Sequence, residues 1–105
     1  MSDHYILEGK TPVPCDLITW ARSLEQNKHV ALSEKDDVRV STVFLGLDHG
    51  YGRSDPPILF ETLVFGTLRY DQEGERYATW DEAEEGHNRW LIKVITDGWV
   101  PEEEE

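Results

Sequence analysis

Apolar residues are spaced along this chain in two ways, and each spacing predicts one kind of secondary structure. Two long runs, residues 38–47 and 58–66, are rich in β-branched residues and are apolar at successive positions. Apolar residues on both faces are typical of central strands that are covered on both sides. We predict that these runs are antiparallel neighbours, because the segments between strands are too short for helical crossovers.

Shorter runs predict the other strands. The segment "HYILEGK" at residues 4–10 is the first of them. The segment "VALSEK" at residues 30–35 is the second, and a turn near Lys35–Asp37 leads from it into the run at 38–47. The segment "GERYATW" at residues 74–80 predicts a further short strand.

A first helix is predicted within residues 11–29, where apolar residues recur three or four positions apart. Asp16 favours the start of this helix, because a negative charge is stabilised at the positive end of the helix dipole. Trp20 is expected on the inner face. The recurring apolar residues form one stripe along the helix, which consists of Leu17, Trp20, Ala21 and Leu24.

A second helix is predicted to begin at a capping box formed by Thr79 and Glu82, whose side chains can each bond to the other's backbone N–H. The residues that follow repeat with the spacing of one helix face. That face consists of Trp80, Ala83, His87, Trp90, Leu91 and Val94.

Together these elements predict an α+β domain, a small antiparallel sheet of three to five strands with two helices packed on it, in the order β-α-β-β-β-α. The length of 105 residues suits one domain, which we place at residues 1–100. Residues 101–105 are Pro followed by four Glu, and we expect them to form an acidic, disordered tail.

Composition narrows the classes of partner. The chain has 22 acidic and 10 basic residues, a formal net charge of −12. Such a charge repels phosphate backbones and anionic lipids, so direct binding to nucleic acid or a membrane is not expected, whereas a protein partner with a basic surface is compatible.

Cys15 is the one cysteine, which excludes an intrachain disulfide. No secretory signal or membrane-length apolar stretch is present, and we expect an intracellular soluble protein.

The insert "GLDHGYGRSDPP" at residues 46–57 is the main candidate for function. It joins two strands that a two-residue turn could have joined, and such extra length is often functional. It has no GK[ST] ending, which excludes a phosphate-binding loop. We predict that residues 48–55 form an exposed recognition loop in which Tyr51 and Arg53 contact a partner, since Tyr and Arg often anchor interfaces. A solvated hairpin loop is the alternative.

Two further residues, Glu61 and His87, are polar positions on apolar faces. A carboxylate at Glu61 either faces a ligand or forms a structural bond to a basic or hydroxyl group. His87 is either a core histidine with satisfied hydrogen bonds or, together with His49 and a carboxylate, part of a mononuclear metal site. Asp48 and His49 are adjacent, so in a regular strand they point to opposite faces and cannot grip a metal together. No cofactor, metal or catalytic residue is assigned.

The segments "VSTVFLGLDH", "PPILFETLVFG" and "YATWDEAEEGH" resemble, in the same order, a family of small uncharacterised proteins of tailed phages, prophages and bacteria. The resemblance runs from about His4 to Trp90. The family has no assigned activity, so it assigns no role to any residue. It implies a phage or mobile-element origin and a location in the host cytoplasm.

Three functions follow as hypotheses. The first is a phage accessory protein that binds a host or phage protein without catalysis, for example to inhibit a defence system whose DNA substrate the acidic surface imitates. The second is a small-ligand binder with the 48–55 loop as a lid. The third is a small metal-dependent enzyme that uses His49, His87 and Glu61. The candidate binding residues are Asp48, His49, Tyr51, Arg53, Asp55, Glu61 and His87.

Overall fold

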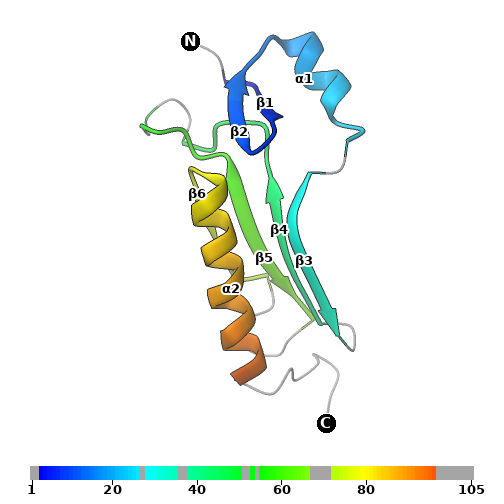
Figure 1. The fold of residues 1–105 in the computed structure, drawn as a ribbon, viewed down its shortest axis with the longest axis vertical. Helices are drawn as coiled ribbons and strands as arrows, with labels where there is room; N and C mark the ends of the chain where they lie inside the picture. Colours follow the sequence, from blue (N-terminus) through cyan, green and yellow to red (C-terminus); the bar gives the residue numbers. More distant parts are fainter. Residues whose placement is uncertain are drawn as a thin grey trace.

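The structure is a computed structural model, and it describes residues 3–26, 28–35, 38–50, 53, 55–66 and 72–96. It confirms the predicted α+β class (Figure 1). The predicted order β-α-β-β-β-α is wrong in detail, because the observed order is β-β-α-β-β-β-β-α. The strands are β1 (Tyr5–Glu8), β2 (Thr11–Pro14), β3 (His29–Lys35), β4 (Val38–Phe44), β5 (Phe60–Phe65) and β6 (Gly74–Tyr77), and the helices are α1 (Leu17–Ser23) and α2 (Trp80–Thr96).

The strands form two antiparallel sheets. Four of them make a sheet in the order β3-β4-β5-β6, while β1 and β2 make a separate hairpin at one end of the molecule (Figure 1). Strands β4 and β5 are antiparallel neighbours, as predicted, and Thr42 lies opposite Thr62. The hairpin is tied to the end of β4, since the N–H of Tyr5 donates to the carbonyl of Gly46 at 2.8 Å.

Helix α2 covers one face of the four-stranded sheet and contacts all four strands. It begins as predicted, because the N–H of Glu82 donates to Oγ1 of Thr79 at 3.1 Å and Oε1 of Glu82 accepts from the N–H of Thr79 at 3.2 Å. The core lies between this helix and the sheet. It consists of Val38, Val40, Phe44, Leu59, Phe60, Val64, Tyr77, Ala83, Trp90 and Val94.

The prediction that the central strands are covered on both sides is wrong. Along β4 and β5, buried residues alternate with less buried ones, so one face is closed by α2 and the other is partly open. Leu32 and Phe65 are exposed on this open face. The sequence pattern was misleading because apolar residues also occupy the face that no sheet or helix seals.

The N-terminal part also differs from the prediction. Residues 11–14, expected as the entry to a helix, form β2 instead, so α1 has only seven residues and packs against β1. Its N-cap is Asp16, whose Oδ1 accepts from the N–H of Thr19 at 2.8 Å. The apolar stripe is not buried as a unit, since Leu17 and Leu24 are exposed and Trp20 is half-buried.

Trp20 is the residue that fixes α1 to the rest of the fold. Its ring centroid lies 5.1 Å from that of His4 in an edge-on arrangement. It also lies over Gly46, where an added Cβ would come within 2.9 Å of the indole Nε1. Gly46 has φ +76°, a conformation that other residues rarely adopt, so this position requires glycine for both reasons.

Two other expectations concern residues outside this description. The acidic tail at 101–105 and part of the turn after Lys35 lie outside the described residues.

Across the described helices, none is long and apolar enough to cross a membrane.

Replacing Trp90 by Ala is expected to lower the free energy of unfolding by about 3–5 kcal/mol, the usual range for a large buried aromatic. Trp90 is 6% exposed and packs among Val38, Val40, Val64 and Val94. Urea denaturation measures the change. Ile92→Ala on the same helix is the matched control, because Ile92 is 64% exposed and should change stability by less than about 0.5 kcal/mol. Equal losses in the two variants would contradict the placement of α2.

Candidate functional site

Five polar side chains form a continuous hydrogen-bonded chain beneath α2. Oγ of Ser33 lies 3.0 Å from Nε2 of His87, and Nδ1 of His87 lies 2.8 Å from Oγ1 of Thr42. Oγ1 of Thr42 is 2.5 Å from Oγ1 of Thr62, which accepts from the hydroxyl of Tyr77 at 3.1 Å. We call these residues the His87 network. It links β3, β4, β5, β6 and α2.

The alternation of the strands places these side chains on one face. Thr42 and Thr62 are direct partners in the register of β4 and β5, so both point toward α2. Thr is also favoured in strands, because its β-branched side chain fits the pleated surface. Gly86 gives Tyr77 room to reach the network, since a Cβ there would overlap the Tyr77 hydroxyl. This contact explains a glycine in the middle of a helix, where it is otherwise unfavourable.

Both ring nitrogens of His87 have a hydrogen-bond partner. Nε2 faces the hydroxyl of Ser33, and Nδ1 faces the hydroxyl of Thr42. A neutral imidazole donates from one nitrogen and accepts at the other, and a hydroxyl can do either, so both bonds form with an uncharged ring.

The electrostatics agree with a neutral ring. Burial lowers the pKa of His87, which is only 3% exposed. Burial also raises the pKa of Tyr77. Both groups are thus held in their uncharged forms near neutral pH.

The partner of Nδ1 bears on catalysis. In a Ser–His nucleophilic pair, a third group, usually a carboxylate, bonds to the ring nitrogen that faces away from the Ser. Here that nitrogen is Nδ1, its partner is the neutral hydroxyl of Thr42, and the ring is almost fully buried. The arrangement therefore holds the helix on the sheet.

A groove of about 390 Å³ runs beside the network, between α2 and the edge strand β3. Its acidic side chains belong to α2, and they face solvent. The groove is lined by Ala31, Asp81, Glu84, Glu85, His87 and Asn88. Because the His87 ring is almost fully covered, the groove offers a ligand an acidic wall and little of the imidazole.

The insert after β4 is closed at its neck by Asp48 and His49. Oδ1 of Asp48 accepts from the N–H groups of Gly50 and Ile58 at 2.7 and 3.1 Å. The N–H of His49 donates to the carbonyl of Ile58 at 2.9 Å, and its Nδ1 lies 3.0 Å from the carbonyl of Leu47. Both side chains satisfy backbone groups where the two strands separate, and the structure gives them a local structural role. The prediction of an exposed loop is therefore wrong at Asp48, which is buried.

The predictions for the remaining candidate residues of the insert are tested only in part. Arg53 and Asp55 are exposed, as a recognition loop requires. Tyr51 lies outside the described residues. The contact of Tyr51 and Arg53 with a partner stays a prediction.

Glu61 forms a structural bond. Its Oε2 lies 3.0 Å from Nε of Arg76, its cross-strand partner in β6. Glu61 points to the open face of the sheet, whereas His87 lies beneath α2 on the other face, so the structure does not bring these two residues together. Within the described ranges, no group of three or more His, Cys, Asp or Glu side chains could hold a metal ion.

Sequence reasoning identified His87 but missed the other four members of the His87 network. The available signal was Thr42, a polar residue at an inward position of a strand, together with a His at an inward position of a helix. Two buried polar positions of this kind have to find partners.

Family models, curated proteins and solved structures give no match to this chain.

Replacing Thr42 by Val is expected to lower the free energy of unfolding by about 1–3 kcal/mol, because it leaves buried donors and acceptors of Thr62 and His87 unpaired. Val keeps the shape and the strand propensity of Thr. Chemical denaturation measures the loss. Ser41→Ala is the control, since Ser41 is the neighbouring residue on the opposite face of β4. A Thr42→Val protein as stable as the wild type would show that the network does not contribute.

The pH dependence of stability tests the neutral ring. The pKa of His87 is lower in the folded protein than its ordinary value of 6.5, so the unfolded chain binds the proton more readily. Stability is then complete above pH 6.5 and falls as the pH drops toward the folded pKa. Urea melts at pH 7.5 and 5.5 should show this loss, and His87→Gln should reduce it. The same pH dependence in both proteins would contradict a buried neutral His87.

Proposed function

We propose that this protein is a small acidic accessory protein of a phage or other mobile element, which acts in the host cytoplasm by binding another protein without catalysis. Inhibition of a defence protein is one form that this role can take. The observation that supports a binding role is the exposed apolar surface of α1. We call it the α1 surface, and it consists of Leu17, Ile18, Ala21 and Leu24.

The α1 surface is unusual for so short a helix. Leu17, Ile18 and Leu24 are 60%, 66% and 51% exposed. Single exposed apolar residues are common on proteins, but a contiguous cluster marks an interaction site. Three members of the α1 surface line a shallow hollow together with Arg22 and Glu25, which gives the apolar centre a charged rim.

The helix that carries this surface is held firmly. Trp20 packs on His4 and Gly46, and these contacts join α1 to the residues before β1 and after β4. A helix that is fixed before binding loses little conformational freedom when a partner docks. The α1 surface is therefore presented in a form that favours binding.

The charge of the chain indicates the partner. A net charge of −12 attracts a protein with a basic rim and accelerates its approach. An apolar patch surrounded by Lys and Arg on that partner would match the α1 surface in both respects.

The test compares two pairs of exposed apolar residues. Leu17→Ser with Ile18→Ser removes the centre of the α1 surface, and Ile92→Ser with Ile95→Ser removes residues of similar exposure from α2. A partner is first identified by pull-down from phage-infected bacteria and then purified. Titration should show that the α1 pair weakens binding about 30-fold or more, as expected for hot spots of about 2 kcal/mol.

The matched α2 pair should leave affinity for the purified partner unchanged. A third variant, Tyr51→Ala with Arg53→Ala, tests in the same titration whether the insert contributes. Wild-type affinity in the α1 pair, or an equal loss in the α2 pair, would overturn the assignment of the α1 surface.

A further inference from the structure

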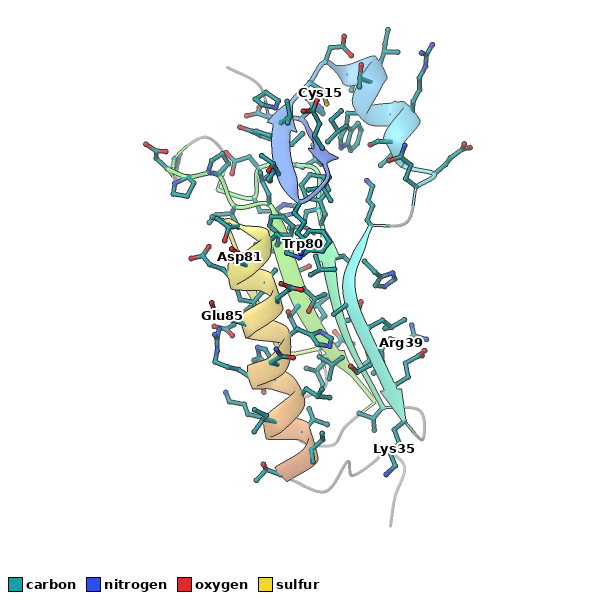
Figure 2. All side chains as sticks on the ribbon, viewed as in Figure 1. Cys15, Lys35, Arg39, Trp80, Asp81 and Glu85 are labelled. Atoms are coloured by element: carbon teal, nitrogen blue, oxygen red, sulfur yellow. The ribbon has the colours of Figure 1, made fainter. Side chains whose placement is uncertain are left out.

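A cavity of about 260 Å³ lies where the hairpin, the end of α1, the start of β3 and the first residue of α2 meet. Figure 2 shows Trp80 at this junction, while Lys35 and Arg39 lie toward the opposite end of the sheet. The cavity shares no residue with the α1 surface or the His87 network. It is lined by Ile6, Leu7, Gly9, Ser23, Gln26, Lys28, His29, Phe44 and Trp80.

The lining has an unexpected charge. The chain has more than twice as many acidic as basic residues, yet no acidic residue lines this cavity and Lys28 does. The groove beside His87 is the contrast, since three of its six lining residues are Asp or Glu. The cavity is thus a basic site in an acidic protein.

Lys28 has no counter-ion among the described residues. None of the ion pairs in that part of the chain includes it. Burial alone lowers the pKa of its ammonium group, with no carboxylate acting in the opposite direction. A cation that is partly withdrawn from water and unpaired gains most from a bound anion.

The other walls are apolar and aromatic. Phe44 and Trp80 belong to the packing around Phe60, with ring centroids 5.3 and 6.3 Å from that of Phe60. Ile6 and Leu7 contribute from the hairpin. A second cation stands nearby, because Nζ of Lys10 lies 5.7 Å from the ring centroid of Trp80. Small-molecule sites have this composition of apolar walls and few charged groups.

We propose that this cavity binds a small organic anion, a carboxylate attached to an apolar or aromatic body, with the carboxylate on Lys28 and the body against Phe44 and Trp80. The volume lies just below the range for drug-sized ligands, so the ligand has on the order of ten non-hydrogen atoms. The site is independent of the protein partner proposed above.

Titration with benzoate tests the site, and benzamide is the uncharged molecule of the same shape. The indole N–H signal of Trp80 in ¹⁵N-labelled protein reports binding, and its disappearance in Trp80→Phe identifies it among the four Trp signals. Benzoate should shift this signal saturably. Benzamide should bind at least tenfold more weakly, because it cannot pair with the ammonium group.

Two lysine variants complete the test. Lys28→Met keeps the apolar stem and removes the charge, and it should weaken benzoate binding at least tenfold without changing benzamide binding. Lys93→Met is the matched control, since Lys93 lies over Trp90, 4.5 Å from that ring, at the other end of α2. A benzoate shift that does not saturate, equal affinity for the two probes, or unchanged benzoate affinity in Lys28→Met would overturn the proposal. Normal binding of the protein partner by Lys28→Met separates the two proposals.

Discussion

The fold depends on the hydrogen bond between Thr42 and Nδ1 of His87, which joins the helix layer to the sheet where neither side chain reaches water. On one side of this bond lies the apolar cluster around Trp90, and on the other lies the cluster around Phe60. Apolar contacts alone would tolerate small shifts of α2 along the sheet. The hydrogen bond does not tolerate such shifts, because they would leave buried polar groups unpaired. It therefore fixes the register of α2 on the sheet.

Much of this arrangement could be predicted from local pattern. The runs at 38–47 and 58–66 marked β4 and β5, and Thr79 with Glu82 marked the start of α2, because strand alternation and capping depend on neighbours in sequence. The burial of the strands could not be predicted in the same way. An apolar residue such as Phe65 has the same identity whether or not another layer covers it, and only the tertiary arrangement decides.

The candidate site shows the same division. Glu61 and His87 were recognised as polar residues that needed an explanation, yet the partner of each comes from a distant segment. Glu61 finds Arg76 through the pairing of β5 with β6, and His87 finds Thr42 through the packing of α2. Sequence spacing does not encode these pairs, so a ligand-binding role stayed open beside the structural role until the strands were placed.

The region beneath the middle of α2 and the hairpin end of the described structure differ in how many of their buried polar atoms have hydrogen-bond partners. Beneath the middle of α2, every hydroxyl and ring nitrogen of the His87 network has a partner. Among the described residues, the buried side-chain polar atoms without a partner are Nε1 of Trp20 and Nε1 of Trp80, and both tryptophans adjoin the hairpin. The unpaired Lys28 and the exposed α1 surface lie at the same end. Polar groups without a hydrogen-bond partner or counter-ion concentrate where proteins bind ligands and other proteins, because a group that already has its partners gains nothing from binding.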